Sequence, residues 1–514
     1  MNHTQPNQYI SKWIFARFAA RSGLNGRSWS AMSAVSSAVD REAAKRLAKM
    51  VAIGGALLGI LYGYDQANAG SAQLFFKPDL GLSDWEAATT LTAVPYGILL
   101  GCLLGSIPSN RWGRKKTVLM VTIGYIIFCL AEAAAWNFAS IMVARMLLGF
   151  TIGVSLICVP VFIAESAATA KRGRVLVAYQ LAGVFGIMCA FAVAMAVNNL
   201  PNSWNWRLMF AVSAIPALCL LPLVLKLPET SRWLMMKGRR ADAEAVLLSV
   251  DPDVDPTATL DEMQAAIQDE AAGSLGHMFK KPYLRATIFL VIMGLLIQLT
   301  GINAFVSYGP IIIKELGFDN FQSLALNLVI NTICFIAVIV AMLYVDRWGR
   351  KPIIMGGFAG MVVGVALAGL AFGTVGADGF AGWQKVVALL GQTIVMASFN
   401  FGVGGTVWAW ASESLPSHLR TYGAAVLLAA DLIGNIVILQ FFTAVVNAIG
   451  MTAVMGIFAV LAIIGILFVW KFAPETKGRD VDDVRKFWEN GGKWPKEGAL
   501  AGTAKAPGDG SAQA

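Results

Sequence analysis

The strongest constraint on this chain is a series of long apolar runs. A run of about 20 apolar residues spans the hydrocarbon core of a bilayer, and backbone groups in lipid must pair within their own segment. The sequence therefore predicts an all-α membrane protein with twelve transmembrane helices. We expect them near 48–70, 88–109, 117–136, 140–164, 175–198, 207–226, 285–313, 323–345, 353–374, 383–412, 421–446 and 451–472.

Composition supports this prediction and removes other classes of protein. Only 14% of the residues are charged, whereas soluble domains carry about 25%. The net charge of +9 comes from short basic clusters between the apolar runs, so we expect no nucleic-acid partner. We find no phosphate-binding loop, metal-ligand cluster or nucleophile–base set. The sequence therefore predicts a protein that is not an enzyme and that has no metal or cofactor.

Lysine and arginine in the short loops predict the orientation. They concentrate after the second, fourth, eighth and tenth runs, and such clusters mark the cytoplasmic side. Both termini are then cytoplasmic, and we expect a multi-pass protein of a plasma membrane, namely a bacterial inner membrane. Residues 1–46 and 474–514 are interpreted as cytoplasmic tails, and 496–514 as a disordered end. The linker 228–284 is expected to hold short helices near 241–249 and 260–272.

The chain also repeats itself. The segment Arg111-Trp-Gly-Arg-Lys recurs at Arg347, and Pro228-Glu-Thr recurs at Pro474. A Glu seven residues before an Arg occurs at Glu165 and again near residue 413. Each copy follows the equivalent apolar run, so the sequence predicts two six-helix halves, 47–227 and 285–473. Parallel repeats of this kind place a substrate site between the halves near the bilayer midplane, and permit alternating access.

These motifs resemble those of the sugar porter family of the major facilitator superfamily, from about residue 50 to 480. The first helix carries a Gly-Tyr-Asp signature, and the loops after the second and eighth helices resemble G-x-x-x-D-R-x-G-R-R, with Asn110 in place of the family's Asp in the first loop. Further resemblances are the segments Pro228-Glu-Thr-Ser-Arg-Trp-Leu234, Gln298-Leu-Thr-Gly-Ile-Asn303 and Pro474-Glu-Thr-Lys-Gly478. The resemblance is specific for the family and not for a substrate.

Two charged residues lie within apolar helices. Asp65 is in the first helix and Arg145 in the fourth, and intramembrane charges are costly unless they face a cavity or a partner. The resemblance implies that the pair is a proton-coupling site, in which protonation of Asp65 releases Arg145. The alternative is a permanent structural salt bridge.

The resemblance also implies a set of substrate-binding side chains. Amides would bind hydroxyl groups, and Trp408 would stack on the apolar face of a sugar ring. An isolated amide in a membrane helix could instead bond to a neighbouring helix. The expected binding residues are Gln180, Gln298, Asn303, Trp408, Asp431 and Asn435.

Several positions depart from the family pattern. Ile187, Ile297 and Ser307 replace two glutamines and an aromatic residue, and Asp431-Leu432 replaces a Gln-Trp pair. The pocket has therefore lost hydroxyl-binding groups and gained an acid, which leaves room for a cyclitol or for a deoxy or amino sugar. Asp431 is open to several interpretations: it could bind hydroxyls, bind a cationic group, take a second proton or be paired structurally.

The loop motifs are expected to form cytoplasmic salt bridges that close one transport state and break in the other. They also suit a simpler role as topology determinants. The predicted gate residues are Arg111, Arg114, Glu165, Arg172, Glu229, Arg232, Asp346, Arg347, Arg350, Glu413 and Arg420. A separate stripe, Gly97, Gly101 and Gly105, is expected to let a neighbouring helix approach closely.

The sequence therefore favours a secondary active transporter of a sugar or sugar-like polyol that works by alternating access, with protons as co-substrate. One alternative is an uncoupled facilitator of the same fold, and another is a nutrient sensor that signals through its tails. The expected partners are a small polar solute, protons and the lipid bilayer, and we expect a monomer.

Overall fold

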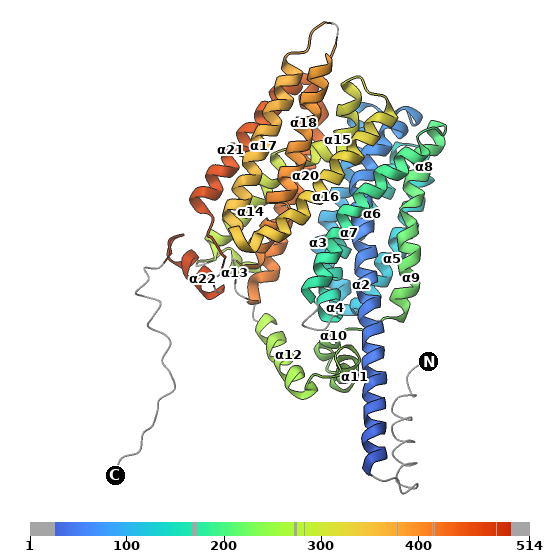
Figure 1. Ribbon diagram of the computed structural model, residues 1–514, viewed down its shortest axis with the longest axis vertical. Helices are drawn as coiled ribbons and strands as arrows, with labels where there is room; N and C mark the ends of the chain where they lie inside the picture. Colours follow the sequence, from blue (N-terminus) through green and yellow to red (C-terminus); the bar gives the residue numbers. More distant parts are fainter. Residues whose placement is uncertain are drawn as a thin grey trace.

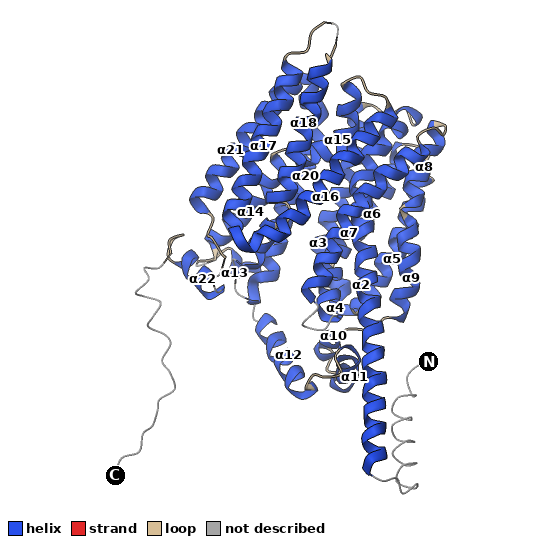
Figure 2. Cartoon of the chain, in the orientation of Figure 1, coloured by secondary structure: helices blue, strands red, loops and turns tan. Residues whose placement is uncertain are grey.

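The computed structural model describes residues 26–166, 172–271, 275–281, 283–377, 379–413, 415, 417–477, 479 and 481–494. The described residues form helices joined by short loops, with no strand among them (Figure 2). Eleven helical segments in this part are long and apolar enough to cross a membrane, and α7 adds the apolar segment 181–197. The twelve-helix prediction is therefore confirmed.

The spanning helices follow the predicted runs closely. In the first half they are α2 (Gly26–Asp79), α3 (Asp84–Leu104), α5 (Arg114–Ala133), α6 (Phe138–Ser166), α7 (Arg172–Val197) and the pair α8 (Asn202–Val212) and α9 (Ala214–Lys226). In the second half they are α14 (Leu284–Leu299) with α15 (Ile302–Glu315), α16 (Asn320–Trp348), α17 (Arg350–Gly373), α18 (Gly382–Ser398) with the π-helix η2 (Phe399–Val403) and α19 (Thr406–Glu413), α20 (Ser417–Ile449) and α21 (Met451–Phe472).

Four of the predicted runs are interrupted helices. The clearest break separates α14 from α15 at Gly301, whose φ is +89°. A Cβ at this position would lie 2.4 Å from the Phe458 ring, so both the left-handed backbone and the close packing require glycine. The helix α14 ends one residue after Gln298 and α15 begins one residue before Asn303, so both amides lie at the interruption.

The two halves lie side by side, as Figure 1 shows. Within the first half α2 packs on α7 and α3 packs on α6, and within the second half α14 packs on α20 and α17 on α18 and α21. Between the halves, α3 contacts α20, α7 contacts α16 and α2 contacts α15. The helices at this interface carry most of the polar residues discussed below.

The glycine stripe of α3 has the predicted function. A Cβ at Gly97 would lie 2.1 Å from the Met146 carbonyl oxygen, and one at Gly101 would lie 2.2 Å from that of Phe150. Such distances are far inside van der Waals contact, so only glycine permits this approach. The stripe holds α3 against α6, and thereby brings Arg145 of α6 to the same level as the polar part of α2.

Short helices within the first half, between the halves and after the second half lie at one end of the bundle, which we call the linker side (Figure 1). They are α4 (Ser106–Trp112), α10 (Ser231–Met236), α11 (Arg240–Val250), α12 (Pro256–Ala271), α13 (Leu275–Met278) and α22 (Val481–Glu489). The two short linker helices predicted from the sequence correspond to α11 and α12. The predicted disordered end, 496–514, lies outside the described residues.

The first helix is longer than predicted. Residues 26–46, interpreted from the sequence as part of a tail, continue the transmembrane helix as one uninterrupted α2 of 54 residues. Arg41 on this extension pairs with Asp253 of the linker at 2.9 Å, with both side chains exposed. The sequence lacks a long apolar stretch here because the extension lies outside the bundle, so hydropathy does not detect it.

The halves are joined on the side opposite the linker. The Thr92 hydroxyl donates to Gln440 Oε1 at 2.7 Å, and Gln440 Nε2 donates to the Thr89 hydroxyl at 3.1 Å. The rings of Trp85 and Phe441 meet edge to face with centroids 5.9 Å apart. The contacting residues lie near the start of α3 and near the end of α20, far from the linker side. This end of the interface is therefore closed.

Candidate functional site

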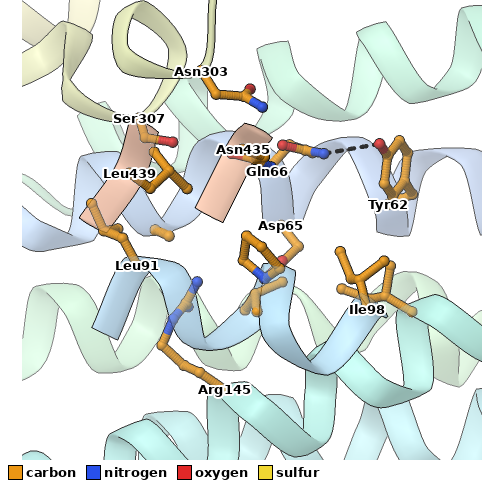
Figure 3. A pocket seen from close by; sticks show the side chains of 14 residues that line it. Tyr62, Asp65, Gln66, Leu91, Ile98, Arg145, Asn303, Ser307, Asn435 and Leu439 are labelled. Atoms are coloured by element: carbon orange, nitrogen blue, oxygen red, sulfur yellow. Dashed lines mark hydrogen bonds between the residues drawn. The ribbon is translucent and has the colours of Figure 1, made fainter. Parts of the chain in front are cut away.

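A cavity lies between the two halves, near the middle of the spanning helices (Figure 3). Its walls come from α2, α3 and α6 of the first half and from α15 and α20 of the second. Half of the lining residues are apolar, Leu91 and Ile98 among them, and the other half are polar. The polar lining residues are Tyr62, Asp65, Gln66, Arg145, Asn303, Ser307 and Asn435.

Hydrogen bonds on one side of α2 determine which of its residues face the cavity. Tyr64 and Asn68 both donate to the Met209 carbonyl oxygen, at 2.9 and 3.2 Å. These bonds anchor α2 to α8 and leave Asp65 facing the cavity, 6% exposed. One residue further, Gln66 Nε2 donates to the Tyr62 hydroxyl at 2.9 Å. Asp65 was predicted from the sequence, whereas Tyr62 and Gln66 were not, because they carry no motif of their own.

The partner of Arg145 differs from the predicted one. Its Nη1 lies 3.5 Å from Glu132 Oε1, and its Nε donates to the Thr90 carbonyl oxygen at 2.8 Å. Arg145 is 1% exposed and Glu132 0%. Asp65 makes no ion pair or hydrogen bond with a described residue, although its carboxylate and Arg145 both border the cavity. In this conformation, Glu132 is therefore the counter-ion of the buried guanidinium.

Three predicted binding residues form a hydrogen-bonded chain in the second half. Asn303 Nδ2 donates to Gln298 Oε1 at 2.7 Å, and Gln298 Nε2 donates to Asp431 Oδ1 at 2.8 Å. The close approach of α14 and α20 makes this possible, since a Cβ at Gly434 would lie 2.9 Å from the Gln298 side chain. Only Asn303 of the three borders the cavity directly.

The other predicted binding residues are placed differently. Asn435 borders the cavity and is 6% exposed, and its Oδ1 has no hydrogen-bond partner. Trp408 is 39% exposed and is not among the residues that line the cavity in this conformation. The side chain of Gln180, on α7, lies outside the described residues. The structure thus brings Asp65, Arg145, Asn303 and Asn435 to one cavity.

The repeated loop motifs build equivalent structures on the linker side. Glu229 Oε1 accepts from the backbone N–H groups of Arg114 and Lys115 at 3.0 and 3.1 Å. In the second half, Glu475 accepts from the backbone of Arg350 and Lys351 at 3.1 and 3.0 Å. Each carboxylate thereby caps the N-terminus of the third helix of its half.

The first-half motif also contains buried ion pairs. Glu165 lies 3.2 Å from Arg114 and 3.7 Å from Arg232, and it accepts from the Thr230 hydroxyl at 2.6 Å. Burial raises the pKa of Glu229, while its backbone hydrogen bonds from Thr230, Lys115 and Arg114 act in the opposite direction. These contacts join helices within one half.

The remaining predicted gate residues are only partly described. Arg111 and Arg347 are exposed on the linker side, and the Arg347 carbonyl oxygen accepts from Lys477. The side chains of Arg172, Asp346, Glu413 and Arg420 lie outside the described residues. The predicted latch between the halves therefore stays a prediction.

Two repeated six-helix halves that enclose a polar cavity within the membrane define a secondary transporter. The chain belongs to the sugar (and other) transporter family, whose model matches residues 51–488, and thus to the sugar porters of the major facilitator superfamily. It is a transporter and not an enzyme.

Relatives and solved structures agree with this assignment. The chain is 30% identical to the glucose transporter GlcP of Staphylococcus epidermidis over 85% of its length and 96% of that protein. It is 28% identical to the arabinose-proton symporter of Bacillus subtilis over 85% of its length and 94% of that protein. The inward-open xylose transporter XylE of E. coli superposes with a TM-score of 0.73 at 25% identity, covering 85% of this chain and 99% of that one.

Proposed function

We propose that this protein is a proton-coupled symporter of a sugar or sugar-like polyol. The observation that carries the proposal is the unpaired Asp65 carboxylate at the cavity between the halves, beside the buried Arg145. Such a group is costly to keep charged away from water and is expected to exchange protons with the cavity. The names of the relatives, which include a sugar–proton symporter, support the same activity.

Coupling between proton and solute transport would arise because Arg145 can pair with either Asp65 or Glu132. When Asp65 is charged it attracts the guanidinium, and when Asp65 is protonated that attraction is lost. Glu132 then holds Arg145, as it does in this conformation at 3.5 Å. Since Arg145 lies on α6 and Asp65 on α2, the exchange changes contacts within the first half and shifts the balance between two conformations.

We further propose that the conformation is inward-facing. Loop arginines and lysines place the linker side in the cytoplasm, and the contacts between Gln440 and the α3 threonines close the outer side. Both termini would then be cytoplasmic, in a bacterial plasma membrane. The halves 47–227 and 285–473 would rock about the cavity, and the loop ion pairs around Glu165 would support the cytoplasmic end of the first half in both states.

A specific observation also favours a second candidate function. If the Arg145–Glu132 pair were permanent, Asp65 would have no cation to release, and the protein would be an uncoupled facilitator. The solute site would be the same, so the two functions differ only in their dependence on the proton gradient.

The test is solute uptake into proteoliposomes, with and without an inward proton gradient. The panel would contain hexoses, pentoses and cyclitols, and the variant would be Asp65→Asn. The matched control is Asp253→Asn, which removes an exposed linker carboxylate. We expect accumulation above equilibrium in the wild type and the control, and only equilibration in Asp65→Asn. Uptake that equilibrates in all three proteins regardless of the gradient would establish the facilitator.

A further inference from the structure

The hydrogen-bonded chain from Asp431 fixes the orientation of two amides. An ionised carboxylate can only accept hydrogen bonds, so it requires the Gln298 amide to present its N–H. The Gln298 oxygen then faces Asn303 and takes an N–H from it, at 2.7 Å. Asn303 is thereby turned so that its carbonyl oxygen is not used within the chain. The side chain that borders the cavity therefore offers an acceptor.

A second acceptor lies close by on α20. Asn435 is one helical turn after Asp431, on the same face of the helix. It is 6% exposed, it borders the cavity, and its Oδ1 has no hydrogen-bond partner. A buried carbonyl oxygen without a donor costs free energy, so the arrangement is expected to be completed by a donor on the transported solute.

The charges around the cavity also favour a ligand that donates hydrogen bonds and carries a positive charge. The described charged groups are the carboxylates of Asp65, Glu132 and Asp431 and the guanidinium of Arg145. Their formal net charge is +1 − 3 = −2 when all are ionised. Glu132 pairs with Arg145. No described Lys, Arg or His forms an ion pair with Asp431. One proton on Asp65 leaves one negative charge without a partner.

We propose that the second-half side of this cavity selects a polyol that carries a protonated amine, such as an amino sugar. An ammonium group has three donors, no acceptor and a positive charge, and it would be bound by the oxygens of Asn303 and Asn435 in the field of Asp431. A hydroxyl at the same place supplies a single donor and no charge. Asp431 is thus a specificity-determining residue that acts through Gln298, and Asp65 remains available for the proton. The inference rests on the proposed function, in that it takes this cavity for the transport site.

Equilibrium binding tests the inference without a proton gradient. Purified full-length protein in lipid nanodiscs would be titrated with D-glucosamine and D-glucose, and with D-galactosamine and D-galactose, at neutral pH, where most of each amine is protonated and added acid does not neutralise Asp431. We expect each amino sugar to bind at least tenfold more tightly than its neutral parent, because hydrogen bonds to charged groups are about twice as strong as neutral ones. N-acetyl-D-glucosamine, which keeps the nitrogen and loses the charge, should lose the advantage.

Variants connect the preference to Asp431. The isosteric Asp431→Asn should reduce the ratio between amine and parent to within about threefold, and Asp253→Asn in the linker should leave it unchanged. Equal binding of amines and parents by the wild type, or binding of neither, overturns the inference even if Asp431→Asn fails to fold. A ratio that survives Asp431→Asn overturns it as well.

Uptake separates this inference from the proposed function. Proton-driven accumulation of a neutral sugar, with no preference for amines in binding, would leave the symporter intact and overturn the selectivity. Preferential binding of amines with uptake that is indifferent to the proton gradient would support the selectivity and count against coupling.

Discussion

The buried pair of Arg145 and Glu132 makes a quantitative prediction about stability. The atoms Nη1 and Oε1 are 3.5 Å apart, and the two side chains are 1% and 0% exposed. Unit charges at this distance attract by about 5 kcal/mol at an effective dielectric constant of about 20. Loss of one partner of a buried pair typically costs about 3–5 kcal/mol, since the other charge is left uncompensated.

We therefore expect Glu132→Gln to lower the free energy of unfolding by about 3–5 kcal/mol. The measurement is equilibrium unfolding in mixed micelles, by titration of dodecyl maltoside with sodium dodecyl sulfate. The exposed Glu244→Gln on α11 is the matched control, with an expected change within about 0.5 kcal/mol. The double variant with Arg145→Met should recover at least half of the loss, because no unpaired charge then remains.

One result would refute this reasoning. If Glu132→Gln changes the unfolding free energy by less than about 1 kcal/mol, the resident counter-ion of Arg145 is another group, and Asp65 is the only described carboxylate that also borders the cavity with it. A double variant that loses as much as the sum of the single ones would show that the two side chains do not interact.

Three further predictions follow from packing and capping. Gly101→Val should abolish folding or cost several kcal/mol, since its Cβ would lie 2.2 Å from the Phe150 carbonyl oxygen and overpacking of this kind is destabilising; detergent-resistant monodispersity would report it, and normal behaviour would contradict the tight α3–α6 contact. Glu475→Ala removes two N-terminal hydrogen bonds of α17 and should cost about 1–2 kcal/mol in the same micelle titration, and no change would show that the cap is dispensable. Gln440→Leu removes the two hydrogen bonds of this side chain to α3 on the side opposite the linker, so spin labels placed there should show a larger population of long distances; an unchanged distribution would contradict the closing role.

Much of the fold could be predicted from the sequence because hydropathy and repeats report on depth and symmetry. The twelve apolar runs located the spanning helices, and the repeated motifs at Arg111 and Arg347 located the equivalent loops. The interruption at Gly301 was not predicted, since a left-handed glycine leaves no mark on an apolar pattern. The extension of α2 was also missed, because polar residues on a helix outside the bilayer resemble those of a flexible tail.

The site was harder to predict because contacts between helices are not local. Asp65 and Arg145 were identified from their intramembrane depth, but depth does not tell which neighbour a charge will meet. Glu132 was given no role from the sequence, although it is the fully buried partner of Arg145. Likewise, the amide chain from Asp431 exists only because α14 and α20 lie side by side. These relations depend on tertiary packing, which a single sequence does not encode in any local pattern.

The unbroken length of α2 has a mechanical consequence. Asp65 at the cavity and Arg41 near the linker belong to one helix, and the 24 residues between them correspond to about 36 Å of rise. A tilt of about 10° at the cavity would move the far end by roughly 6 Å. A small rearrangement around the solute therefore produces a larger displacement at the far end of the helix. A probe attached at this exposed end would report whether the cavity is occupied.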